Sequence, residues 1–152
     1  MTDAATPQPV YPSHKVPSIR RLMMPRDTNA LGTIFGGIIL AEIDLAAAIE
    51  SHKCHPAKVV TVSMDKVVFK APVYIGDLVS FFTETLRVGR TSITVHVSVW
   101  AQRRFGGGEF AHVTEADVTM VAVDDDFKPT PILRSPPAVP PGPTPPESPR
   151  RP

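Results

Sequence analysis

The residues at positions 36–51, GGIILAEIDLAAAIES, limit the possible folds more than any other segment of the chain. They contain no proline and stay mainly apolar for longer than one strand, which is typical of a helix. Glu42 and Asp44 interrupt the apolar residues, and the segment is too short to cross a bilayer. The sequence therefore predicts one long helix packed within a globular domain, and it predicts no membrane insertion.

Five other segments have the composition of strands, at residues 18–24, 58–69, 76–90, 91–102 and 111–124. The fourth alternates most regularly, because every second residue from Ile93 to Val99 is apolar and those between are polar. Most turns between these segments are too short for parallel crossovers. We therefore predict an α+β fold, with one long helix against an antiparallel sheet of five or more strands.

The two ends of the chain differ in composition from the middle. Half of the 18 prolines lie in the last eighteen residues, which have little apolar surface to bury. With 152 residues, the chain suits one domain. We predict a flexible N-terminus at residues 1–16, one domain at residues 17–134 and a disordered proline-rich tail at residues 135–152.

Charge and cysteine content exclude several classes of protein. The net charge of +1 argues against a protein that mainly binds nucleic acid. Cys54 is the only cysteine, so no disulfide forms within the chain. The first fifteen residues lack the apolar core of a signal peptide. A cytoplasmic protein is expected.

Asp44 is unusual because it stands in the middle of the apolar helix. Burying a lone carboxylate is costly unless another group pairs with it or the reaction uses it. Two readings stay open: Asp44 is a catalytic base, or it is a structural acid bonded to the backbone of a neighbouring chain.

Helical periodicity assigns the neighbours of Asp44 to two faces. The face away from Asp44 is bulky and is expected to fill the core, with Phe35, Ile38, Ile39 and Ile49. The residues around Asp44 are nearly all small, and they are Gly37, Leu40, Ala41, Ala47 and Ala48. This face allows a second backbone or a thin ligand to approach.

The helix begins with Gly36 and Gly37, whose amides carry the positive end of the helix dipole. Such amides can hold a developing oxyanion. The alternative is that the two glycines only permit close packing where the helix begins.

Several motifs of the sequence occur together in a known family. The motifs TNALGTIFGG at 28–37, Asp44 seven residues later, FKAPVYIGD at 69–77 and VGRTS at 88–92 occur in this order. Together they resemble the small bacterial acyl-coenzyme A (acyl-CoA) thioesterases of the hot-dog fold, the YciA-like group related to cytosolic acyl-CoA hydrolases of animals. The resemblance spans nearly the whole predicted domain.

The resemblance implies a helix wrapped by an antiparallel sheet, in subunits that pair with active sites at the dimer interface. It implies a homodimer or a trimer of dimers, with acyl-CoA as substrate and no separate cofactor. It also implies a catalytic role for Asp44, as general base or as nucleophile, and for Asn29 and Gly37. The substrate-binding residues that it implies are Gly36, Lys70, Arg90, Thr91 and Ser92.

The sequence departs from the family pattern at two places. The family often has two glycines shortly after the aspartate, where this chain has Ala46 and Ala47. A bulky aromatic residue commonly follows the paired glycines, where this chain has Ile38. These departures leave the expected chemistry intact but prevent any transfer of acyl specificity.

Two alternative functions compete with hydrolysis. One is a non-catalytic acyl-CoA-binding module, which would not need Asp44 or Asn29. The other is a hydratase or dehydratase of the same fold, which typically uses a histidine near the start of the helix, and no histidine occurs between Lys15 and Glu50.

The remaining histidines fit structural roles better. His52, Cys54 and His55 form one possible zinc cluster, but structural zinc usually needs four ligands, so we expect the histidines to end the helix and no metal to bind. His96 is expected to face solvent or another subunit.

Overall fold

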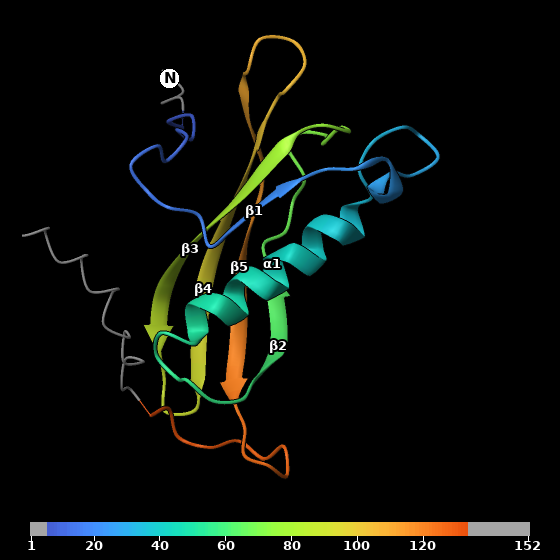
Figure 1. The fold of residues 1–152 in the computed structure, drawn as a ribbon. Coiled ribbons are helices and arrows are strands. Elements are labelled where there is room, and N and C mark those ends of the chain that lie inside the picture. Colours follow the sequence, from blue (N-terminus) through green and yellow to red (C-terminus); the bar gives the residue numbers. More distant parts are fainter. Residues whose placement is uncertain (1–5, 134–152) are drawn as a thin grey trace, which may run out of the picture.

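The computed structural model describes residues 6–133 (Figure 1). The predicted tail at 135–152 lies outside the described residues. The elements in chain order are β1 (Ile19–Leu22), the short 3₁₀ helix η1 (Pro25–Asp27), α1 (Gly36–Ser51), β2 (Val59–Asp65), β3 (Leu78–Val88), β4 (Ser92–Gln102) and β5 (Phe110–Ala122). The helix therefore begins at the paired glycines, as the sequence predicts.

The five strands form one antiparallel sheet in the order β1-β3-β4-β5-β2. Figure 1 shows α1 lying across one face of this curved sheet. The predicted α+β architecture of one long helix and a five-stranded antiparallel sheet is confirmed. β2 is an outermost strand of the sheet, so among residues 6–133 it pairs on one side only, with β5.

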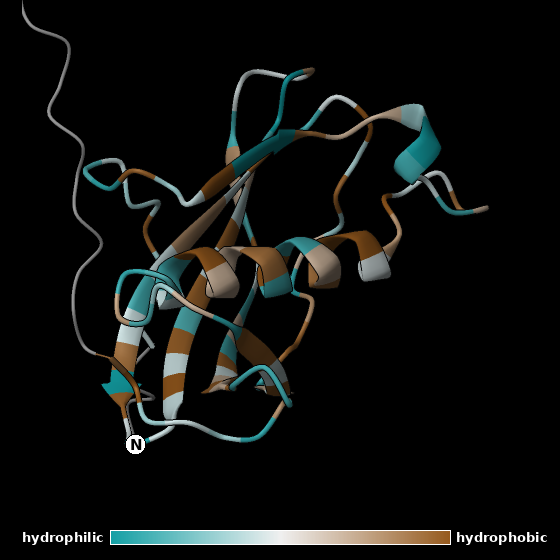
Figure 2. Ribbon diagram, turned by 60° about the horizontal axis from the view of Figure 1, so that its bottom comes forward, coloured by the Kyte–Doolittle hydropathy of each residue, from teal (hydrophilic) through white to brown (hydrophobic). Residues whose placement is uncertain are grey.

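The core lies between α1 and the inner face of the sheet. The alternation predicted for β4 is confirmed, because every second residue from Ile93 to Val99 is fully buried. β5 contributes the matching inward residues Val118 and Met120. Figure 2 shows the resulting bands of hydrophobic and hydrophilic residues across the strands.

The predicted core face of the helix is partly wrong. Phe35 and Ile49 were expected inside, but 58% and 46% of their surfaces are exposed. Ile43, Ala46 and Ala47 are fully buried against the sheet instead. Because the helix is apolar nearly all round, its sequence pattern does not select one inward side. The small alanines let α1 approach the strands closely, which leaves bulky residues pointing outward.

Residues 6–17, most of which were expected to form a loose end, have specific contacts on the outer face of the sheet, opposite α1. The Tyr11 ring packs edge-on against Phe82 and Trp100, with centroid separations of 5.5 and 5.7 Å. It also lies 4.0 Å from the ring centroid of Phe110. No local pattern predicts these contacts, because they join segments far apart in the chain.

Candidate functional site

Asp44 lies near the middle of α1 and is half-buried. The hydroxyl of Thr61, on β2, donates a hydrogen bond to Asp44 Oδ1. Among residues 6–133, no hydrogen bond reaches the other carboxylate oxygen, Oδ2. The carboxylate is thus directed toward the open edge of the sheet and keeps one free oxygen, rather than being enclosed in an apolar setting.

Thr61 is the site residue that sequence reasoning missed. It pairs with Met120 across the β2–β5 ladder, and its hydroxyl also lies 3.3 Å from Met120 Sδ. Threonine is common in strands for its shape alone, so no local signal distinguishes Thr61 from other strand threonines. Only the packing of α1 on the sheet brings it to Asp44.

The start of α1 borders a cavity of about 320 Å³. Gly36 lies on its wall together with Phe69 and Lys70, which follow β2. A methyl group added to Gly36 would stand 3.6 Å from the Phe69 ring, so the ring packs closely over the helix start. The N-cap residue, Phe35, makes no capping hydrogen bond through its side chain, so first-turn amides of the helix are available to a ligand. Gly36 and Lys70 are therefore brought together, as members of one binding site would be.

Lys70 is half-exposed at this cavity, and its Nζ lies 3.7 Å from a carboxylate oxygen of Glu115. An ion pair of this length and exposure contributes little to stability. The lysine therefore remains able to move toward an anionic ligand.

Asn29 lies in the loop that leads to α1 and is bound to that loop. Its Oδ1 accepts hydrogen bonds from the amides of Leu31 and Thr33, at 2.9 and 3.2 Å. Its Nδ2 donates to the Thr33 hydroxyl at 3.0 Å. Within residues 6–133, no hydrogen bond joins Asn29 to Asp44. In a single chain Asn29 shapes the entry to the helix and does not reach the carboxylate.

The VGRTS segment forms the turn between β3 and β4. This turn lies at the end of the sheet remote from the start of α1 (Figure 1). Arg90 is exposed, and its carbonyl accepts a hydrogen bond of 2.9 Å from Ile132 N. The Thr91 carbonyl accepts one of 2.8 Å from Ala122 N, and Ser92 begins β4. One chain therefore does not bring Arg90, Thr91 and Ser92 to the cavity beside Gly36.

Glu50, near the end of α1, is a second acid that faces the sheet, and the sequence analysis did not single it out. It accepts hydrogen bonds from Lys53 at 2.6 Å, from Thr83 at 2.9 Å and from Thr85 at 3.1 Å. Burial acts to raise the pKa of Glu50, but these hydrogen bonds outweigh it and hold the pKa below its usual value. A buried carboxylate with three donors fits a structural role, whereas Asp44 accepts only one hydrogen bond within residues 6–133.

The histidine-rich segment after α1 has structural contacts. His55 is buried, and its Nδ1 accepts a hydrogen bond of 3.2 Å from Leu133 N, while His52 Nδ1 lies 3.3 Å from the His55 carbonyl. Cys54 is a half-buried free thiol. No group of three His, Cys, Asp or Glu side chains within residues 6–133 is arranged to hold a metal ion. In the same part of the chain, no helix is both long and apolar enough to span a membrane.

Comparison with known proteins identifies close relatives. A model of the thioesterase superfamily matches residues 31–104. The acyl-CoA thioester hydrolase YciA of Salmonella typhimurium is 38% identical over 116 residues, which cover 75% of this chain and 87% of that protein.

Solved structures agree with this match. A hexameric hot-dog-fold thioesterase of Campylobacter jejuni is 49% identical, with a TM-score of 0.74 over 79% of this chain and 92% of its own. An acyl-CoA hydrolase of Staphylococcus aureus, solved with butyryl coenzyme A and coenzyme A, is 34% identical, with a TM-score of 0.68 over 75% of this chain and 69% of its own. These likenesses confirm the hot-dog fold predicted from the sequence.

Proposed function

The chain belongs to the acyl-CoA thioester hydrolases of the thioesterase superfamily, and on this basis we propose that it hydrolyses acyl-CoA to a free carboxylic acid and coenzyme A. The observation that carries the proposal is the setting of Asp44. Its carboxylate is oriented by Thr61 through one oxygen, and the other oxygen is left for a water molecule. This is the arrangement that a general base requires.

In the proposed reaction, Asp44 Oδ2 removes a proton from water as the water oxygen attacks the thioester carbonyl carbon. The carbonyl oxygen becomes an oxyanion, which first-turn amides such as that of Gly37 stabilise. Collapse of this intermediate breaks the carbon–sulfur bond, and the proton held by Asp44 passes to the departing thiolate. No separate cofactor takes part.

Asp44 and Gly37 of one chain are too far apart to serve the same thioester. Gly37 precedes Asp44 by seven residues in α1, or about 10 Å along the helix axis. A base and an oxyanion donor must each lie within about 3 Å of the reacting group. A second copy with its α1 antiparallel would bring its own Gly37 and Asn29 toward Asp44. We therefore place the site between two subunits.

The surface of the chain supports such pairing. Leu45 and Ile49 are about half exposed on the outward side of α1, although both are apolar. On β2, at the edge of the sheet, Val62 is 60% exposed. An apolar helix face next to an unpaired strand edge is a typical subunit interface. The relative from C. jejuni is hexameric, so we propose a homodimer that assembles into a trimer of dimers.

Light scattering tests the assembly. A dimer or hexamer is expected at micromolar concentration, whereas a fully active monomer would contradict the shared site. Mixing two inactive variants, Asp44→Asn and Asn29→Ala, should restore part of the activity, because some hybrid dimers contain one intact site. No recovery after verified subunit exchange would argue against the shared site.

The remaining predicted residues are assigned to substrate binding. Gly36 and Lys70 border the cavity at the start of α1, so we propose that they contact the substrate there. Arg90, Thr91 and Ser92 are proposed to bind the nucleotide end of coenzyme A, with the second subunit spanning the distance to the thioester.

A panel of acyl-CoA substrates with different chain lengths tests the function, with free thiol as the readout. Thiol release catalysed by the protein is expected for at least one chain length. Binding without thiol release would instead indicate a non-catalytic module. Addition of water to an enoyl-CoA would indicate a hydratase.

A single turnover in water enriched in heavy oxygen separates the two possible roles of Asp44. If Asp44 is a general base, the label appears only in the released acid. If its carboxylate attacks directly and forms an anhydride, the label appears in Asp44 itself.

A further inference from the structure

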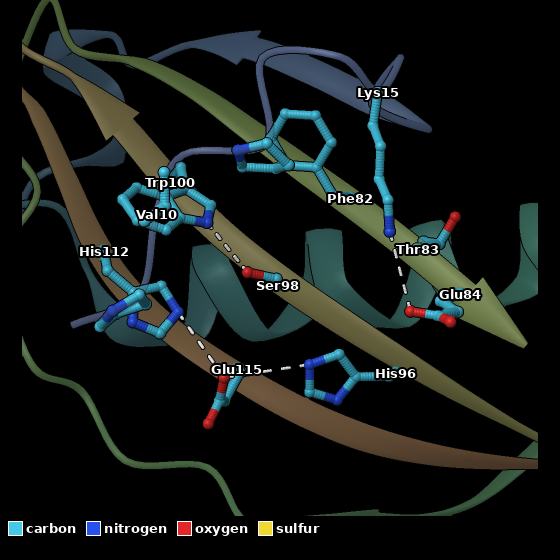
Figure 3. Close-up of a pocket in the computed structure, with 12 residues that line it drawn as sticks. Val10, Lys15, Phe82, Thr83, Glu84, His96, Ser98, Trp100, His112 and Glu115 are labelled. Carbon is cyan, nitrogen blue, oxygen red and sulfur yellow. Dashed lines mark hydrogen bonds and ion pairs between the residues drawn. The ribbon is translucent and has the colours of Figure 1, made fainter. Parts of the chain in front are cut away.

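The outer face of the sheet, opposite α1, carries a second cluster of functional side chains beneath residues 9–15 (Figure 3). We refer to residues 9–15 as the N-terminal strap. The strap and the sheet border a partly open cavity of about 170 Å³, with Pro9, Val10 and Pro12 on one wall and Trp100 and His112 on another. The reaction proposed above uses none of these groups.

The strap is held mainly by one aromatic side chain and two weak polar contacts. Tyr11 packs among Phe82, Trp100 and Phe110, and Arg20 donates to its hydroxyl at 3.3 Å. Lys15 Nζ lies 3.7 Å from a carboxylate oxygen of Glu84, and both side chains are largely exposed. Because exposed ion pairs contribute little, a modest change beneath the strap can alter its attachment.

His112 lies directly beneath the strap. Its side chain is only 8% exposed, and neither ring nitrogen is hydrogen-bonded within the described residues. Its ring centroid lies 4.8 Å from that of Trp100, and the Glu115 carboxylate is 3.8 Å from Nε2, too far for a hydrogen bond. Buried polar atoms are nearly always hydrogen-bonded, so this histidine is an exception that calls for an explanation.

The groups around His112 form a chain of charges across β4, β5 and the segment after β2. Figure 3 shows Glu115 between His112 and His96, and His96 Nε2 lies 3.9 Å from Glu115. On its other side, His96 Nδ1 lies 2.7 Å from Asp117, which Lys66 contacts at 2.6 Å. Hydrogen bonds from Lys66 and His96 lower the pKa of Asp117, so this carboxylate stays charged and bound.

The charged groups that border this cavity or are linked to it by ion pairs are balanced in number. The strap and β3 contribute Lys15 and Glu84, β4 contributes His96, and β5 contributes Glu115 and Asp117. The segment after β2 contributes Lys66 and Lys70. Three lysines therefore oppose three carboxylates. No net negative charge is available to stabilise a proton added to His112.

We propose that the N-terminal strap is released by protonation of His112. The imidazolium has two N–H donors, and in the closed arrangement neither has an acceptor within hydrogen-bond distance among residues 6–133. Lifting the strap admits water, which can accept from both. A proton that binds the open arrangement more tightly shifts the equilibrium toward it.

The direction of the pH effect agrees with the surroundings of His112. Burial lowers its pKa, the positive charges of Lys70 and His96 act in the same direction, and Glu115 opposes them. The closed state therefore holds fewer protons than the open state near the usual histidine pKa of about 6.5. The strap stays closed above this range and is released as the pH falls through it. Release uncovers an apolar patch formed by Phe82, Trp100 and Phe110.

Trp100 reports strap opening directly, because it is the only tryptophan and is 5% exposed. Acrylamide quenching of its fluorescence measures its access to solvent between about pH 8 and pH 5.5, a range that spans the histidine pKa. The quenching constant should rise several-fold as the pH falls. Far-UV circular dichroism should stay constant, which separates strap release from unfolding.

Three variants sharpen the test. His112→Phe keeps an aromatic ring beside Trp100 and should abolish the rise, and His112→Gln serves if the first variant does not fold. Tyr11→Ala should give high quenching at every pH. His14→Gln replaces an exposed strap histidine and should leave the transition unchanged.

Three results would overturn the proposal. The first is a quenching constant that does not change with pH in the wild-type protein. The second is a transition that survives in both His112 variants. The third is a rise in quenching that coincides with loss of the circular dichroism signal, which would show unfolding of the whole domain. Each result is independent of thioesterase activity.

Discussion

Replacing Thr61 with valine removes the hydroxyl that donates to Asp44 while keeping the size and branching of the side chain. A hydrogen bond to a charged group contributes about 1.5–3 kcal/mol. If this bond holds the carboxylate in its reactive orientation, its loss raises the activation barrier by a similar amount. Because about 1.4 kcal/mol corresponds to a factor of ten in rate, we expect kcat to fall about 10- to 150-fold.

The stability of the Thr61→Val variant should hardly change. Thr61 is exposed on an edge strand, and valine is at least as favourable as threonine there, so the free energy of unfolding should stay within about 0.5 kcal/mol. Thiol release from saturating acyl-CoA gives kcat, and urea unfolding gives stability. Thr61→Ser keeps the hydroxyl and should recover most of the rate.

Thr119→Val is the matched control. Thr119 lies on the adjacent strand β5, between the inward-facing Val118 and Met120, and so points to the other face of the sheet. The control should keep full activity. Unchanged kcat in Thr61→Val would refute a positioning role for Thr61, as would a loss of activity that Thr119→Val shares or that only tracks the folded fraction.

Three further predictions concern stability and binding. Glu50→Gln should lower the free energy of unfolding at neutral pH by about 1–3 kcal/mol, because it breaks the charged contact with Lys53. Because the pKa of Glu50 is lowered, the stability that its charge contributes is complete above the usual pKa of about 4.5 and is lost as the pH falls below it. In urea unfolding, the difference between the variant and the wild type should therefore be smaller at pH 3.5 than at pH 7. A constant difference would argue against a charged Glu50. Ile43→Ala should lower the free energy of unfolding by about 2–5 kcal/mol, because Ile43 is fully buried. In a dissociated monomer, Ile49→Ala should lower it much less, because Ile49 is half-exposed. Equal losses would contradict the assigned helix faces. Arg90→Ala should raise KM for acyl-CoA more than it lowers kcat, and the rise in KM should shrink as salt is added. An unchanged KM would mean that the VGRTS segment is only a hairpin turn and does not bind coenzyme A.

Most elements of the fold were predictable because each has a local sequence pattern bounded by turn residues. Alternation from Ile93 to Val99 identifies β4, and the proline-free apolar run after Gly36 identifies α1. Short turns then require an antiparallel sheet. None of these inferences needs contacts between residues distant in sequence.

The orientation of the helix was not predictable in the same way. Its residues are apolar on almost every side, so the choice between Ile43 and Ile49 as the inward residue depends on how closely the sheet approaches. The small side chains of Ala46 and Ala47 allow the helix and the sheet to lie close together on that side. The exposed apolar side of the helix is the surface on which we propose that a second subunit packs.

The candidate site shows the same limit. Asp44 was found because a carboxylate within an apolar helix is conspicuous, and Gly37 because it follows the helix start. Their separation along α1, and the hydrogen bond from Thr61, depend on three-dimensional packing. His112 was equally hidden, because histidine in an alternating strand carries no sign that the distant N-terminal strap will lie over it.

The kcat of the Asp44→Asn variant in acyl-CoA hydrolysis tests the central claim most directly. Asparagine keeps the size of the side chain and an oxygen that can accept from Thr61, but it is no longer a base. We expect kcat to fall by about 10²- to 10⁴-fold while acyl-CoA still binds and stability is unchanged. Asp126→Asn, at an exposed acidic turn, should retain full activity. Near-normal kcat in Asp44→Asn, or a loss of activity that only follows a loss of folded protein, would contradict the account and make Asp44 a structural acid.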